Sequence, residues 1–128
     1  MKILVVEDDP DARKVLSLIL RLDGFEVTSA SGGPEAIQVL AEALPDLVLL
    51  DVMMPDMDGY EVCVWIRANP ATARLPVVML SAKADPESMA RGLEVGANGY
   101  LAKPIKPSSL TRQLHTVIVR SAERVPVL

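Results

Sequence analysis

The chain has 128 residues and a formal net charge of −4; half of its residues are hydrophobic and only 3% are aromatic. This length fits one domain with a mostly aliphatic core. The acidic balance argues against a nucleic-acid-binding surface, which is usually basic. Cys63 is the only cysteine, so an intramolecular disulfide and a thiolate zinc site are excluded.

Nothing in the sequence indicates export or membrane insertion. The apolar run near the N-terminus, residues 3–6, is too short for a signal peptide, and no stretch approaches the length of a membrane-spanning helix. A single cysteine also suits a reducing compartment. We therefore expect a cytoplasmic protein that has no contact with membranes.

The first half of the chain predicts three strands and two helices. Residues 3–6 (ILVV) and 47–50 (LVLL) are continuous apolar runs, typical of strands buried on both faces, whereas residues 25–28 (FEVT) alternate like an edge strand. Between the strands, apolar residues recur at helical spacing. They are Val15, Leu18, Ile19 and Leu22 in the first interval, and Ile37, Leu40, Ala41 and Leu44 in the second.

The second half continues this alternation. Residues 77–80 (VVML) predict a fourth strand and residues 99–102 (GYLA) a weaker fifth. Helical spacing joins Val62, Trp65 and Ile66, and later Leu110, Leu114, Val117 and Ile118. Prolines at 10, 34, 86 and 107 stand where helices should begin, a position that tolerates proline.

Five β-then-α units predict an α/β fold with a doubly wound, five-stranded parallel sheet and five helices. Parallel strands need crossover connections, and the helical intervals provide one for each strand. Ligands of such sheets bind beyond the carboxyl ends of the strands. Functional side chains are therefore expected directly after the predicted strands.

Charged and polar residues occupy those positions. Glu7 and Asp8 follow the first strand, Asp51 the third, Ser81 the fourth and Lys103 the fifth. Two carboxylates ~4 Å apart repel by on the order of 4 kcal/mol at an effective dielectric constant near 20, so a cation should accompany them. Mg²⁺ prefers oxygen ligands, and a carboxylate beside a cation can accept a phosphoryl group.

Four segments in this order resemble the receiver domain of two-component response regulators, in particular the chemotaxis receivers. They are VVEDD at 5–9, LLDVMMPDMDG at 49–59, MLSAKA at 79–84 and GYLAKPI at 99–105. The resemblance covers nearly the whole chain. It implies a flavodoxin-like fold with strand order 2-1-3-4-5.

The resemblance also implies a phosphorylation site. Asp51 matches the phosphoacceptor of the family. Glu7, Asp8 and the backbone carbonyl of Met53 match the residues that hold Mg²⁺ together with Asp51, and Mn²⁺ is a possible substitute. We expect no enzymatic activity beyond self-catalysed phosphotransfer and autodephosphorylation.

Three further positions match the family's switch and phosphoryl-binding residues. Ser81 matches the switch hydroxyl, Lys103 the lysine that binds the phosphoryl group, and Tyr100 the aromatic residue that changes orientation on activation. The resemblance further implies a cis peptide bond before Pro104. The surface that responds is formed by the fourth helix, the fifth strand and the last helix.

The implied partners are a sensor histidine kinase or a histidine phosphotransfer protein, and an unidentified effector. We expect a receiver domain over residues 1–121, with 122–128 as a tail or the start of a linker, and no direct nucleic-acid binding by the domain. A weak homodimer is possible. Asn98 and Gly99 replace the two acids that many transcription-factor receivers carry before the tyrosine, which weakens the case for their charge-paired dimer.

Two other functions are compatible with an aspartate beside a magnesium site. The first is a magnesium-dependent phosphatase that uses an aspartyl-phosphate, but enzymes resembling the haloacid dehalogenases need a second acid where this chain has Met53. The second is a pseudo-receiver that binds a partner without phosphorylation, although every expected residue is present.

Overall fold

The computed structural model describes residues 1–123 and contains five strands that alternate with five helices. The elements are β1 (Lys2–Val6), α1 (Pro10–Leu22), β2 (Glu26–Ala30), α2 (Gly33–Glu42), β3 (Leu47–Asp51), α3 (Gly59–Ala68), β4 (Val77–Ser81), α4 (Pro86–Glu94), β5 (Gly99–Ala102) and α5 (Pro107–Glu123). This order confirms the alternation predicted from the sequence.

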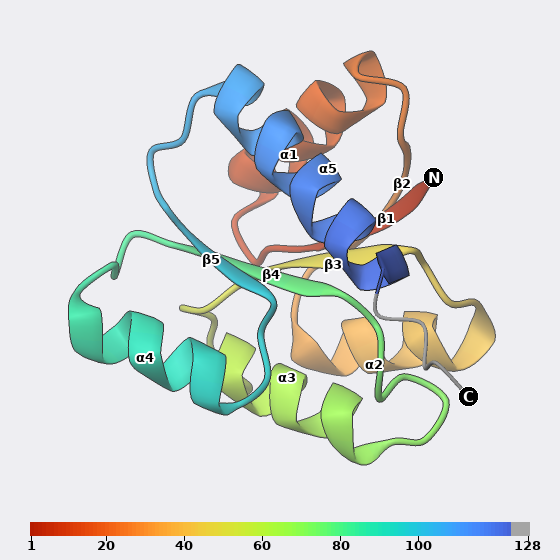
Figure 1. The fold of residues 1–128 in the computed structure, drawn as a ribbon, viewed down its shortest axis with the longest axis vertical. Coiled ribbons are helices and arrows are strands. Elements are labelled where there is room, and N and C mark those ends of the chain that lie inside the picture. The colour runs from red at the N-terminus through yellow and green to blue at the C-terminus, as the bar shows by residue number, and fades with distance from the viewer. Residues whose placement is uncertain (124–128) are drawn as a thin grey trace.

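The strands form one parallel sheet in the order β2-β1-β3-β4-β5. Helices α1 and α5 cover one face, and α2, α3 and α4 cover the other (Figure 1). The predicted doubly wound α/β fold is therefore confirmed. Because all strands run in one direction, their carboxyl ends meet at one edge, where Val6 pairs with Leu50 and Asp51 with Leu80.

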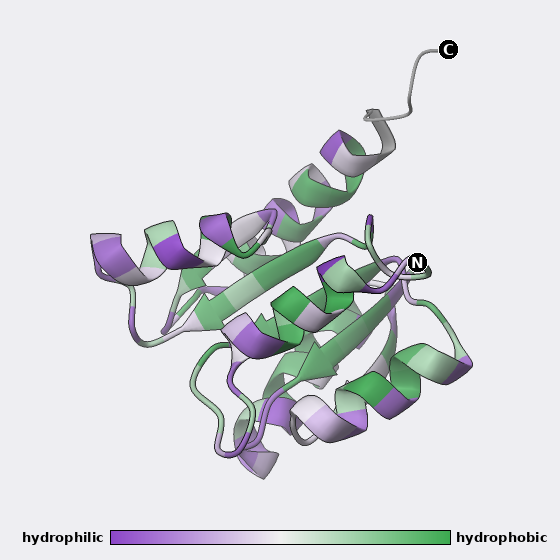
Figure 2. Ribbon diagram, turned by 90° about the horizontal axis from the view of Figure 1, so that it is seen from below, coloured by the Kyte–Doolittle hydropathy of each residue, from purple (hydrophilic) through white to green (hydrophobic). Residues whose placement is uncertain are grey.

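Two hydrophobic cores flank the sheet and explain the continuous apolar runs. Leu4 and Val6 of β1 pack with α2 and α3, whereas Ile3 and Val5 pack with α1 and α5. Successive side chains of a strand point to opposite faces, so a strand covered on both faces needs apolar residues throughout. The apolar strands accordingly lie between the helices (Figure 2).

Helix α1 buries a different face from the one that its spacing predicted. Leu16 and Leu20 pack into the core, while Val15, Leu18 and Leu22 are exposed, the last by 80%. Six of the eight residues from 15 to 22 are apolar, so two apolar stripes overlap on this helix. Contact with the sheet, rather than hydrophobic spacing, selects the buried stripe.

The boundaries of some elements also differ from the expected ones. Strand β2 begins at Glu26 and extends to Ala30, so Phe25 precedes it as a core residue. Helix α5 continues to Glu123, and the remainder of the expected tail, residues 124–128, lies outside the described residues. The domain limits at 1–121 stay a prediction. No helix within residues 1–123 is long and apolar enough to cross a membrane.

The segment from Asp51 to Gly59 connects the third strand to the next helix through a constrained turn. Asp58 caps α3, accepting a hydrogen bond from the Glu61 amide at 2.9 Å, and Glu61 completes a capping box. Asp56 has a φ of 66°, in the left-handed region that aspartate tolerates better than most residues. Asp56 thus adopts a turn conformation that the sequence did not reveal.

Gly59 offers a test of how tightly this segment is packed. A Cβ atom at Gly59 would lie 2.5 Å from the Asp51 carbonyl oxygen and 2.7 Å from the Val52 Cα atom. Because backbone atoms cannot move aside easily, Gly59→Ala should lower the free energy of unfolding by about 1–3 kcal/mol, measured by urea denaturation. Gly99→Ala is the matched control, since its Cβ would meet only ordinary contacts at 3.6 Å or more. Equal stability of the two variants would contradict the prediction.

Candidate functional site

Three carboxylates meet at the carboxyl edge of the sheet. Glu7 and Asp8 follow β1, Asp51 ends β3, and one carboxylate oxygen from each lies within 4.8 Å of the others. Glu7 is only 2% exposed and Asp51 is also buried, whereas Asp8 is half-buried on the solvent side. The structure therefore brings together the three acids that the sequence singled out.

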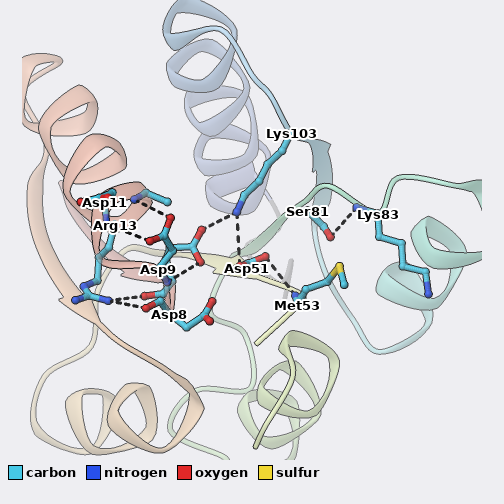
Figure 3. Close-up of polar contacts among 11 residues, drawn as sticks. Asp8, Asp9, Asp11, Arg13, Asp51, Met53, Ser81, Lys83 and Lys103 are labelled. Atoms are coloured by element: carbon cyan, nitrogen blue, oxygen red, sulfur yellow. Dashed lines mark hydrogen bonds and ion pairs between the residues drawn. The ribbon is translucent and has the colours of Figure 1, made fainter. Parts of the chain in front are cut away.

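Lys103 reaches these acids from the end of β5 (Figure 3). Its Nζ atom lies 2.6 Å from Oε1 of Glu7 and 3.6 Å from Oδ2 of Asp51. The backbone N–H of Lys103 donates to the Ser81 carbonyl at 2.9 Å, which holds the lysine next to β4. Its ammonium group thus contacts both Asp51, at the end of β3, and Glu7, which follows β1.

The proton affinities of these groups reflect burial and mutual repulsion. Burial raises the pKa of the Glu7 carboxyl, the neighbouring Asp51 raises it further, and Lys103 opposes the shift. Desolvation and then Glu7 likewise raise the pKa of Asp8. Burial by itself lowers the pKa of Lys103, but its bond to Glu7 and the charge of Asp51 leave that pKa raised overall. Lys103 thus offsets only part of the repulsion between the acids.

Ser81 ends β4 at the same edge but is bonded to the loop that follows it. Its Oγ atom accepts a hydrogen bond from the Lys83 N–H at 3.0 Å. The Lys83 carbonyl in turn accepts a hydrogen bond from the Tyr100 hydroxyl. One residue of the β4–α4 loop therefore connects the two expected switch residues.

Tyr100 lies between this loop and α4. Its ring occupies the space beside Gly92, where a Cβ atom would lie 2.8 Å from the ring. Burial and the neighbouring Tyr60 raise the pKa of Tyr100 to about 12, so its hydroxyl remains protonated and able to donate at neutral pH. The position of the ring thus depends on a glycine of α4 and on the loop after Ser81.

The two remaining expected residues flank the acids. Met53 is exposed in the β3–α3 loop, and its N–H donates to Oδ1 of Asp51 at 3.3 Å. The peptide bond between Lys103 and Pro104 is cis, the isomer that the resemblance implied. The role of the Met53 carbonyl as a metal ligand stays a prediction.

Sequence reasoning missed one side chain at this site. Arg13 of α1 lies beside the loop after β1, where its guanidinium contacts backbone carbonyls (Figure 3). No motif indicated this contact, because its acceptors are main-chain atoms. Conversely, Asp9 has a local role, since its side chain caps α1.

The donor set fits a hard divalent cation. Mg²⁺ takes oxygen ligands, binds through one or two carboxylates and keeps several waters. Glu7 and Asp51 provide buried carboxylate oxygens, while Asp8 provides one that solvent can reach. The arrangement can thus hold a cation beside the Lys103 ammonium group.

Comparison with known proteins assigns the family. The model of the response regulator receiver domain matches residues 3–115. The chain belongs to the response regulator receiver family.

It is 40% identical over 122 residues to the DNA-binding response regulator MtrA of Mycolicibacterium smegmatis, covering 95% of this chain and 52% of that protein. It is also 40% identical to the transcriptional regulatory protein GltR of Pseudomonas aeruginosa, covering 93% and 49% respectively. This receiver chain thus spans about half the length of the curated relatives it matches.

Solved structures agree with this assignment. A putative response regulator from Chloroflexus aurantiacus superimposes with a TM-score of 0.89 at 40% identity, covering 93% of this chain and 98% of that one. The chemotaxis protein CheY4 of Vibrio cholerae gives a TM-score of 0.87 at 35% identity, covering 91% and 97%. The flavodoxin-like receiver fold and its role in two-component signalling are therefore shown for this chain.

The raised pKa of Glu7 predicts how stability depends on pH. The folded receiver binds a proton at Glu7 more tightly than the unfolded chain does, so ionisation above the ordinary value of 4.5 lowers the free energy of unfolding. Glu7→Gln cannot ionise there and should gain stability relative to the wild type as the pH rises from 4.5 through the folded-state pKa. Urea denaturation with a chelator present measures this difference.

Glu42→Gln is the control for this experiment, because Glu42 is an exposed glutamate at the end of α2. It removes one exposed carboxylate and so controls for the loss of a single negative charge. Parallel pH profiles of Glu7→Gln and the wild type would show that the Glu7 proton does not affect folding.

Proposed function

We propose that the receiver is a phosphorylation switch in which Asp51 accepts a phosphoryl group from a phosphohistidine. The donor is a sensor histidine kinase or a histidine phosphotransfer protein. The observation that carries this proposal is the convergence of three carboxylates with Lys103, whose Nζ atom lies 3.6 Å from Asp51. An acceptor carboxylate with a cation site on one side and a lysine on the other suits the transfer of an anionic group.

The transfer exchanges one bond for another. A carboxylate oxygen of Asp51 attacks phosphorus, the phosphorus–nitrogen bond breaks, and its electron pair remains on the imidazole nitrogen of the donor. Mg²⁺, or Mn²⁺ in its place, would be held by Glu7, Asp8, Asp51 and the Met53 carbonyl and would neutralise charge on the phosphoryl oxygens. Lys103, now bound to Glu7 at 2.6 Å, is close enough to Asp51 to neutralise further charge. The chemistry of the domain is limited to this transfer and to autodephosphorylation.

The signal leaves the site through Ser81, Lys83 and Tyr100. A phosphoryl oxygen on Asp51 would accept a hydrogen bond from the Ser81 hydroxyl and draw its Oγ atom away from the Lys83 N–H. Loss of the bond from Lys83 frees the backbone of this residue, whose carbonyl holds the Tyr100 hydroxyl. The equilibrium of the surface formed by α4, β5 and α5 then shifts, which changes its affinity for an effector.

The expected setting is the cytoplasm, without direct nucleic-acid binding by the domain and with at most a weak homodimer. The net charge of −4 supports the absence of a nucleic-acid surface. MtrA is named as a DNA-binding response regulator, but the matched region is about half of that protein. The output of this receiver therefore depends on its effector.

Phosphorylation of Asp51 can be tested with acetyl phosphate and Mg²⁺. Intact-mass measurement should show one added phosphoryl group on the wild type and none on Asp51→Asn. Asp56→Asn is the control, because it removes an aspartate from the same loop at a left-handed position that asparagine also tolerates. It should accept the group like the wild type.

Two outcomes would contradict the proposal. An unmodified wild type would indicate a module that binds a partner without phosphorylation. Steady turnover of a chromogenic phosphate ester that is lost in Asp51→Asn would indicate a phosphatase.

The path through Ser81 makes a separate prediction. Phosphorylation should shift the ring NMR signals of Tyr100 in the wild type, because the loop that holds its hydroxyl moves. In Ser81→Ala the shift should be largely lost, even in samples whose mass shows that Asp51 is phosphorylated. An unchanged shift in Ser81→Ala would mean that the signal reaches Tyr100 by another route.

A further inference from the structure

Arg13 holds the loop that carries two of the three acids, and it does so entirely through the backbone. Its Nη1 atom donates to the Glu7 carbonyl at 2.8 Å and to the Asp8 carbonyl at 3.4 Å. Its own backbone N–H donates to the Asp9 carbonyl at 2.9 Å. The Arg13 side chain therefore binds two consecutive carbonyls of the β1–α1 loop, and its N–H makes the first-turn bond of α1 to the third.

These carbonyls need such a donor because the sheet ends before them. The Glu7 N–H still bonds to the Ala30 carbonyl at 3.1 Å, but β1 itself ends at Val6. A carbonyl that is withdrawn from water without a hydrogen bond is destabilising. Arg13 supplies these bonds after the strand ladder has ended, and this fixes the peptide groups from which the Glu7 and Asp8 side chains extend.

Because Arg13 binds carbonyls, its side chain occupies none of the carboxylate oxygens of Glu7 and Asp8. Lys103, by contrast, contacts the carboxylates of Glu7 and Asp51 directly and must share them with any bound cation. Arg13 can therefore orient Glu7 and Asp8 without competing for the oxygens that a metal would use. Residues that orient metal ligands in this way commonly affect metal affinity as strongly as some ligands do.

We propose that Arg13 is a positioning residue, which holds the β1–α1 loop so that the Glu7 and Asp8 carboxylates are preorganised for a divalent cation. This inference rests on the proposed function for the identity of the cation. It goes further in assigning the orientation of two ligands to a side chain that contacts neither carboxylate.

The sign of the change in Mg²⁺ affinity separates positioning from a simple charge effect. Arg13 is positive, so its electric field alone opposes the binding of a cation. Removing its charge would tighten Mg²⁺ binding if the field were all that mattered. Removing its hydrogen bonds would weaken binding if it positions the loop. The two effects have opposite directions.

The test is a calorimetric titration of Arg13→Gln with magnesium chloride. The dissociation constant should rise on the order of tenfold relative to the wild type. Lys14→Gln is the matched control, because it removes the same charge from the next, exposed position of α1; its affinity should be unchanged or slightly tighter. Arg13→Lys keeps the charge but lacks the planar guanidinium, so its affinity should be intermediate. An unchanged or lower dissociation constant in Arg13→Gln would overturn the inference.

Amide hydrogen exchange of the metal-free protein gives a second measurement. Exchange at the Asp9 amide should be faster in Arg13→Gln than in the wild type or Lys14→Gln, and equal rates would also overturn the inference. If Arg13→Gln does not fold, Arg13→Lys takes its place in both measurements, with the same directions expected.

If the wild type binds Mg²⁺ and Arg13→Gln binds it equally well, the proposed function survives and this inference fails. A wild type that binds no Mg²⁺ would reject the metal site of the proposed function as well.

Discussion

Charge compensation at the carboxyl edge of the sheet is the constraint on which the site depends. The parallel register brings the end of β3 next to the end of β1, so Asp51 and the acids that follow β1 must share a small, partly buried space. Their mutual repulsion is on the order of several kcal/mol at such separations. Lys103 offsets part of it at 2.6 Å from Glu7, and the remaining negative charge favours a divalent cation. The same cations can then accommodate an incoming anionic group.

The connection between the site and the output surface is short because both lie on adjacent strands. Ser81 ends β4, Tyr100 lies in β5, and the backbone of Lys83 bonds to both, to Ser81 through its N–H and to Tyr100 through its carbonyl. Gly92 of α4 leaves space for the aromatic ring, so the helix of the proposed output surface also contacts the expected switch residue. In the proposed mechanism, a change at Asp51 needs no long rearrangement to reach α4.

Features that depend on one short segment, such as a helix cap or the buried face of a helix, can be deduced from that segment alone. Asp9 and Asp58 stand directly before α1 and α3 and cap them, and Leu110 and Leu114 of α5 are buried as their spacing predicted. Where apolar residues form two possible stripes on one helix, the sequence could not show which stripe is buried. Helix α1 is apolar on both candidate faces, and only its seating on the sheet shows that Leu16 and Leu20 are buried.

Hydrophobic periodicity and chain direction require no tertiary information. They were therefore enough to predict how strands and helices follow one another along the chain, and to place the acids and the lysine at strand ends. The resemblance then implied roles for those residues. Only the tertiary structure showed which groups hold the others in place. Arg67 donates to the Leu75 and Gly96 carbonyls, each at 2.7 Å, and Arg13 to those after β1. A backbone carbonyl has the same chemistry at every residue, so no sequence pattern reveals which carbonyl an arginine will bind; the fold decides this by bringing distant main-chain atoms within reach.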